Sequence, residues 1–264
     1  MRAPPVVVCG VVAGLLLCCS AARVAWAGPP FLTDDPEPVD LHHWEVYISS
    51  LQQRDPGGLT GTLPHIEMNY GGAPNLQLHM ILPCSFAPAT GEGMALGLGD
   101  TELGVKYRFV EEAHGWPMIG VFPLLEVPTG SAARGLGTGD LQVLVPVWIQ
   151  RSWGPWTTYG GGGYHINPGP GNQNCWYGGW ELQRDFGKHL TLGGELFRTA
   201  PTVVGGHNTL VYNLGGQVNF DDGHHLLFSA GHGMQGDTGF LGYLGYQWTF
   251  GPPEKEPAEA SPGH

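Results

Sequence analysis

The chain has 264 residues, enough for one large all-β domain or two small domains. Asp and Glu number 23 against 11 Lys and Arg, so the net charge is −12 with histidine neutral. This acidity argues against nucleic acid as a partner, because phosphate contacts need a basic surface. The 44 Gly and 23 Pro interrupt almost every window in which a helical period could form, and a two-residue alternation replaces that period.

The first 27 residues have the pattern of a secretory signal peptide. A charged start at Arg2 precedes an apolar run at 6–17, and Ala25-Trp26-Ala27 offers a small-residue cleavage site before Gly28. The run is shorter than the roughly 20 residues that a membrane-spanning helix needs, so a membrane anchor is the weaker interpretation. Cleavage would remove two arginines and three of the five cysteines, which leaves a more acidic exported chain.

Alternating runs fill the rest of the sequence and predict about twelve antiparallel strands. In the last run, GYLGYQWTF at 242–250, the large apolar residues share one parity and Gly, Gln and Thr share the other. The earlier runs lie at 44–48, 66–70, 76–82, 103–109, 119–125, 141–149, 156–165, 176–182, 190–196, 210–220 and 226–230.

The connections between these runs alternate in length. Short turn-forming stretches (GGAP, EEAHG, SWGP, DFGK and DDG) follow the even strands, and longer pieces (RDPGGLTG, residues 84–99, PTGSAARGLGTG and NPGPGNQN) follow the odd ones. This asymmetry is typical of bacterial outer-membrane barrels. The sequence therefore predicts a single antiparallel transmembrane β-barrel at 43–250 with both ends in the periplasm. An acidic periplasmic lead-in at 28–42 precedes the barrel, and a disordered periplasmic tail at 251–264 follows it.

The polar parity of the strands carries the charges. A water-excluded core could not hold so many charges, whereas a wet lumen can, so the apolar parity is expected to face lipid. A soluble lipocalin-like barrel is the alternative, and it predicts an inward apolar parity. The expected lumen or constriction residues are Glu45, Glu67, His79, Glu102, Lys106, Arg108, Glu126, Gln142, Glu181 and Glu195.

Aromatic residues are expected at the two membrane interfaces. Six tryptophans lie near predicted strand ends, as an aromatic girdle requires: Trp44, Trp116, Trp148, Trp153, Trp156 and Trp176. The pattern of Gly245, Trp248 and Phe250 also resembles the signal that outer-membrane barrels present to their insertion machinery, although here the tail follows it.

Three stretches carry a family resemblance: PPFLTDDPEPVDLHHWEVYI at 29–48, GDTELGVKYRF at 99–109 and PLLEVPTGSAARGLGTGDLQVLVPVW at 123–148. They resemble a family of outer-membrane proteins named for the meta-pathway of phenol degradation. The resemblance implies an outer-membrane barrel that passes small, often aromatic or hydrophobic molecules. It supplies no catalytic residues.

Passage of small solutes is thus the first hypothesis, and a structural barrel with a closed lumen is the second. The charges of Glu102, Lys106 and Arg108 fit either a constriction that orients solutes or a network that fills the lumen. Because acidic positions outnumber basic ones, an open pore should favour cations or neutral solutes. A lipid-modifying enzyme is the third hypothesis, but no nearby Ser or GxSxG motif accompanies the strand histidines, so neither catalysis nor a cofactor is expected.

Two further features leave alternatives open. Cys84 and Cys175 are expected at the outer rim, where a disulfide would hold a loop over the mouth, and two free thiols are the alternative. The acidic stretch 33–43 is interpreted as part of the lead-in. A hard-metal ligand set or a partial plug that enters the barrel from below are its alternatives, although the spacing matches no calcium loop.

Overall fold

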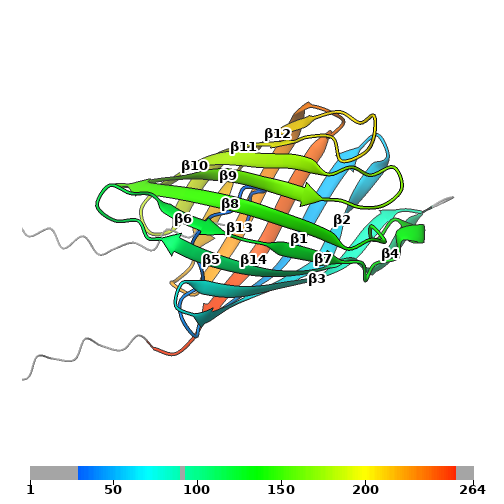
Figure 1. The fold of residues 1–264 in the computed structure, drawn as a ribbon. Helices are drawn as coiled ribbons and strands as arrows, with labels where there is room; N and C mark the ends of the chain where they lie inside the picture. Colours follow the sequence, from blue (N-terminus) through cyan, green and yellow to red (C-terminus); the bar gives the residue numbers. More distant parts are fainter. Residues whose placement is uncertain (1–28, 90–92, 254–264) are drawn as a thin grey trace, which may run out of the picture.

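The computed structural model describes residues 29–89 and 93–253. The predicted signal peptide and the tail beyond residue 253 therefore lie outside the described residues. Within the described part, fourteen strands and one short 3-10 helix form an all-β fold whose strands curve into a barrel (Figure 1).

The strands follow one another around the barrel in antiparallel order. β14 returns to pair with β1, from Trp44 opposite Phe250 to Arg54 opposite Phe240, and this ladder closes the sheet. The strands are β1 (Trp44–Asp55), β2 (Gly58–Ala73), β3 (Leu76–Pro88), β4 (Met94–Leu98), β5 (Thr101–Val110), β6 (Met118–Val121), β7 (Leu124–Val127), β8 (Gln142–Trp153), β9 (Trp156–Ile166), β10 (Cys175–Asp185), β11 (Leu190–Thr199), β12 (Thr209–Asn219), β13 (His224–Gln235) and β14 (Phe240–Phe250), and η1 (Ala132–Arg134) is the helix.

The number of strands in the closed ring is twelve. β6 and β7 form one barrel strand, since both pair with β5 on one side and with β8 on the other. Phe122 and Pro123 separate them, and proline cannot donate a hydrogen bond to the ladder. β4 pairs with the last residues of β3 and extends the wall beyond the ring. The predicted fold class and strand number are confirmed.

Two connections differ from the prediction at the barrel end opposite the chain termini, which is the end predicted to face outward and is called the outer end below (Figure 1). RDPGGLTG contains only a two-residue turn at 56–57, because β1 continues to Asp55 and β2 begins at Gly58. Residues 84–99 are likewise largely strand, in the β3–β4 hairpin. Both stretches continue the ladder although Gly and Pro mark them as loops by composition. The longer connections on this side are 128–141, 167–174 and 200–208.

The apolar parity points outward. Ile48 and Leu214 are 56% and 64% exposed, whereas their neighbours Ser49 and Asn213 are buried. The same holds around the ring, and it overturns the soluble lipocalin-like alternative. Large apolar side chains outside and polar side chains inside are the arrangement of a barrel that spans a bilayer. Among the residues described, no helix has the length and hydropathy to cross a membrane.

Replacing Leu214 by Arg should test the lipid-facing surface. Because Leu214 lies near the middle of β12, the charged side chain should cost about 2–4 kcal/mol of unfolding free energy in a bilayer. Urea unfolding in lipid vesicles, followed by tryptophan fluorescence, would measure the loss. Val204→Arg is the control, since Val204 is 71% exposed in an outer connection and the change there should be within about 0.5 kcal/mol. Equal effects at both positions would contradict the orientation.

Candidate functional site

The ten expected lumen residues all lie on the inward parity. Seven of them are buried (Glu45, Glu67, His79, Lys106, Gln142, Glu181 and Glu195), and three are half-buried (Glu102, Arg108 and Glu126). They are distributed over eight strands, and along each strand they alternate with outward residues. Their role as a constriction stays a prediction.

Several wall carboxylates are engaged by other wall side chains. His79 Nε2 lies 2.9 Å from Glu102 Oε1, and His79 Nδ1 lies 2.7 Å from Asn69 Oδ1. Asn69 in turn donates to Glu67 at 2.9 Å. These bonds cross β2, β3 and β5, so they tie three neighbouring strands together on the inner face.

A second group surrounds Glu45 where the barrel closes. Tyr47 Oη donates to Glu45 Oε2 at 2.8 Å, and Gln247 Nε2 donates to Glu45 Oε1 at 2.7 Å. Gln247 lies on β14, so the bond joins the last strand to the first. Buried carboxylates need such partners because an unpaired charge is costly away from water.

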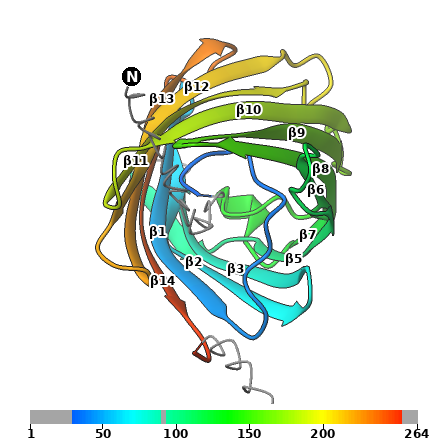
Figure 2. The ribbon, with the colours of Figure 1, turned by 90° about the vertical axis from the view of Figure 1, so that its left-hand side faces the viewer.

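Residues 30–40 lie inside the ring of strands, where the segment before β1 crosses the lumen (Figure 2). Lys106 Nζ on β5 lies 2.9 Å from Asp34 Oδ1 and 3.4 Å from Asp35 Oδ2. Thr33 and Asp35 are fully buried. The lead-in interpretation expects the segment below the barrel. The contacts instead correspond to the partial-plug alternative, because Asp34 and Asp35 bind the ammonium group of Lys106 inside the barrel.

We call residues 30–40 the lumen segment. It also contacts four other strands of the wall. Ser229 Oγ on β13 donates to Pro30 O at 2.7 Å, and Thr33 N donates to Glu195 Oε2 on β11. Gln150 Nε2 on β8 donates to Glu37 Oε2 at 3.3 Å, and Val39 N donates to Gln77 Oε1 on β3 at 2.9 Å. The segment is therefore fixed at several points around the ring. Among the described residues, no group of three or more His, Cys, Asp or Glu side chains is arranged to hold a metal ion.

Two glycines allow the lumen segment to lie against the wall. A Cβ at Gly179 would lie 2.1 Å from Thr33 Oγ1, and a Cβ at Gly120 would lie 3.0 Å from Pro36 Cβ. Glycine within a strand often marks such a close approach. The sequence does not reveal this role of Gly120 and Gly179, because a strand glycine that makes room for another segment cannot be told from one that only weakens the strand.

Sequence reasoning also missed the aromatic part of the lumen. Tyr47, Phe122, Trp148 and Tyr159 are inward and at most 4% exposed. The expectation that Trp148 belongs to an interfacial girdle is therefore wrong. Its parity, shared with Gln150, was the available signal. Other tryptophans near strand ends are exposed, among them Trp44, Trp116, Trp153 and Trp176, and the girdle they would form stays a prediction.

Cys84 and Cys175 are free thiols, so the alternative of two free thiols holds and the candidate disulfide is not formed. Cys84 on β3 lies opposite Leu98, and Cys175 on β10 lies opposite His165. The two cysteines are on separated walls of the ring, and the residues after Cys84 form a hairpin with β4 rather than a loop toward β10.

Cys175 takes part in a polar row near the outer end of the lumen. Its Sγ lies 3.9 Å from His165 Nδ1, and His165 Nε2 lies 3.1 Å from Gln142 Oε1. A sulfur, an imidazole and an amide in this order also occur in thiol hydrolases. Here, however, Cys175 is only 3% exposed, so a substrate has little access to the thiol.

The outer connection 128–141 is folded onto the barrel. Asp100 fixes it, because its carboxylate accepts from Gly130 N at 2.9 Å and from Thr138 N at 2.6 Å. Leu136 of the connection packs with Ala87 and Ala95 of the β3–β4 hairpin. This connection is thus part of the outer rim.

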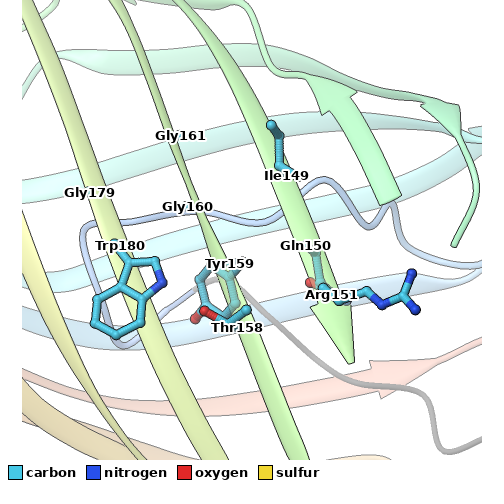
Figure 3. A pocket seen from close by; sticks show the side chains of 9 residues that line it. All are labelled: Ile149, Gln150, Arg151, Thr158, Tyr159, Gly160, Gly161, Gly179 and Trp180. Atoms are coloured by element: carbon cyan, nitrogen blue, oxygen red, sulfur yellow. The ribbon is translucent and has the colours of Figure 1, made fainter. Parts of the chain in front are cut away.

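A groove lies over β8, β9 and β10, with a cavity volume of about 330 Å³ (Figure 3). Gly160 lies opposite both Ile149 and Trp180 and has no side chain to fill the space between them, and these two residues are 44% and 51% exposed. Since these two side chains belong to the outward parity, the groove opens on the apolar surface.

The closed ring, the apolar exterior and the polar lumen define the class: this is an integral β-barrel of the bacterial outer membrane. No family model and no curated protein matches the chain.

One solved structure shows the same fold. An outer membrane channel from Pseudomonas putida F1 has 17% identity and a TM-score of 0.61, over 82% of this chain and 98% of that chain. The translocator domain of the autotransporter NalP from Neisseria meningitidis has 16% identity and a TM-score of 0.44, over 78% of this chain and 88% of that chain. The similarity to the Pseudomonas channel shows a shared fold and nothing further. The TM-score of the NalP domain is too low to support a conclusion.

Replacing His79 by Ala should destabilise the barrel. The change leaves Asn69 and Glu102 without their shared partner, so we expect a loss of about 1–3 kcal/mol in unfolding free energy. Urea unfolding in vesicles measures it. His189→Ala is the control, because His189 is exposed in a turn and should change stability by less than about 0.5 kcal/mol. Indistinguishable variants would mean that the wall network contributes little.

Proposed function

We propose that this barrel allows small solutes, hydrophobic or aromatic molecules among them, to cross the outer membrane by passive diffusion through its lumen. The observation that carries the proposal is the mixed inner wall. Amides and carboxylates alternate there with the rings of Tyr47, Phe122, Trp148 and Tyr159. A wall of this kind can hydrogen-bond a polar substituent and contact an aromatic ring in the same passage.

The family resemblance of the sequence supports the same class of solute. It rests on stretches that include the whole lumen segment and nearly all of strand β5. The barrel of Pseudomonas putida F1 is described as a channel, and its fold is shared by this chain. On this proposal the partners are outer-membrane lipids, the barrel-insertion machinery that would recognise Gly245, Trp248 and Phe250, and the solute.

A structural barrel with a closed lumen is the second candidate. The lumen segment favours it, because the segment is hydrogen-bonded to β3, β5, β8, β11 and β13. Passage then requires this segment to move, or the solutes to be small enough to pass beside it.

Passage is proposed rather than catalysis. The row of Cys175, His165 and Gln142 is the arrangement nearest to a catalytic one that we find in the described residues. The burial of Cys175 leaves a substrate carbonyl without a path to the sulfur, and a nucleophile must reach the atom it attacks. The row therefore fits a structural polar network better.

Planar-bilayer recordings of the mature chain refolded in detergent test the proposal. We expect steady channels that prefer K⁺ over Cl⁻ in a salt gradient, because acidic side chains outnumber basic ones on the inner wall. Glu102→Gln, at a half-buried carboxylate of the inner wall, should reduce this preference, and Asp237→Asn in an exposed outer connection should leave it unchanged. An absence of channels under all conditions would favour the closed barrel, and binding of a radiolabelled aromatic solute would then be measured directly.

A further inference from the structure

We propose that Lys106 is the centre of a carboxylate-binding subsite in the lumen, and that the chain's own Asp34 and Asp35 occupy this subsite and block the passage. A small carboxylate with an apolar or aromatic body is the class of ligand that would compete with them. The inference rests on the proposed passage function and adds a ligand class and a means of regulation to it.

The environment of Lys106 supports a built subsite. The residue is 4% exposed, and its Nζ is bonded to Asp34 and Asp35 at 2.9 and 3.4 Å. The same Nζ lies 5.0 Å from the centre of the Phe122 ring. An ammonium group beside an aromatic face suits a ligand that carries both a carboxylate and an apolar body.

The wall carboxylates leave Lys106 available to such a ligand. Glu45 is bonded to Tyr47 and Gln247, and Glu102 is bonded to His79. Within residues 29–89 and 93–253, the hydrogen bonds of Lys106 thus go to Asp34 and Asp35 of the lumen segment. When the segment leaves, a buried ammonium group loses its partners, which strongly favours their replacement by another carboxylate.

Neighbouring donors extend the subsite along the segment. Gln150 Nε2 donates to Glu37 at 3.3 Å, and Arg108 Nη1 lies 4.0 Å from Glu37 Oε1. Arg108 is also held by Asn75 Oδ1, at 2.6 Å from Nη2. The donors of β5 and β8 therefore converge on the carboxylates at 34–37.

The segment can be displaced without opening the barrel. Its connection to β1 is fixed separately, since His42 N donates to Gly71 O at 2.7 Å and Gly71 N donates to His43 O at 3.0 Å. The ladder between β1 and β14 does not involve residues before Trp44. Release of the contacts at 30–39 would thus leave the wall intact.

The test uses the mature chain with both native cysteines replaced by serine and a reporter cysteine at Thr33, which is fully buried. Labelling of this cysteine by a membrane-impermeant maleimide reports release of the segment. Benzoate should accelerate labelling and increase conductance, whereas benzyl alcohol and benzylammonium at equal concentration should not. Lys106→Met should release the segment without benzoate, with a shift on the order of a hundredfold in the equilibrium, because a buried ion pair is broken.

Two further variants keep the test decisive. Lys188→Met is the matched control, since Lys188 is exposed in the β10–β11 turn and the variant should respond to benzoate as the parent does. Gly179→Val displaces the segment sterically without altering Lys106, although its side chain would also meet the Phe197 ring of the wall. Gly194→Ala is its control, since a Cβ there would meet the end of the Leu214 side chain at 3.1 Å and Asn213 O at 3.6 Å but not the segment. If Lys106→Met fails to fold, Gly179→Val still tests whether the segment blocks the passage.

The outcomes separate this inference from the proposed function. Equal effects of benzoate and benzyl alcohol in a conducting barrel would overturn the subsite and leave passage intact. Conductance of Gly179→Val equal to that of the parent, with the reporter fully labelled, would overturn the blocking role. If the reporter responds to benzoate but no variant conducts, the subsite stands and the proposed passage fails.

Discussion

The closure of the sheet by β1 and β14 is the constraint on which the rest of this structure depends. A backbone N–H or C=O without a partner costs several kcal/mol in hydrocarbon, so a sheet in a bilayer must have no free edge. The ladder from Trp44–Phe250 to Arg54–Phe240 meets this requirement. Once the ring is closed, the alternation of each strand assigns one parity to lipid and the other to the lumen.

That assignment places many polar side chains in the narrow lumen, where buried charges need partners. The structure provides these partners in two ways. On the wall, carboxylates are paired with histidine, amide and tyrosine side chains, as in the bonds of His79 with Glu102 and of Tyr47 with Glu45. In the centre, the lumen segment brings further carboxylates to Lys106. The residues that could conduct a solute are thus the same residues that hold the segment.

The blocked lumen and the proposed passage are compatible when the segment is a removable occupant. Its bonds to the wall are made by side chains of separate strands, whereas the barrel is held by continuous backbone ladders. Side-chain contacts of this kind can be exchanged for contacts with a solute, and the ladders cannot. Gly120 and Gly179 have no side chains, which leaves room for the segment against the wall. The inward rings of Tyr47, Phe122, Trp148 and Tyr159 offer apolar contact to a solute.

The sequence by itself determined the class of fold. Two-residue alternation in twelve runs predicted the strands, and the charges on one parity predicted the wet lumen, because both patterns repeat along the chain and need no knowledge of distant contacts. Only the tertiary structure decided where the amino-terminal segment lies, since the bonds of Thr33 to Glu195 and of Asp34 to Lys106 join residues 162 and 72 positions apart. It also decided that Cys84 and Cys175 remain apart. These outcomes depend on the register and curvature of the closed ring, which a local pattern does not contain.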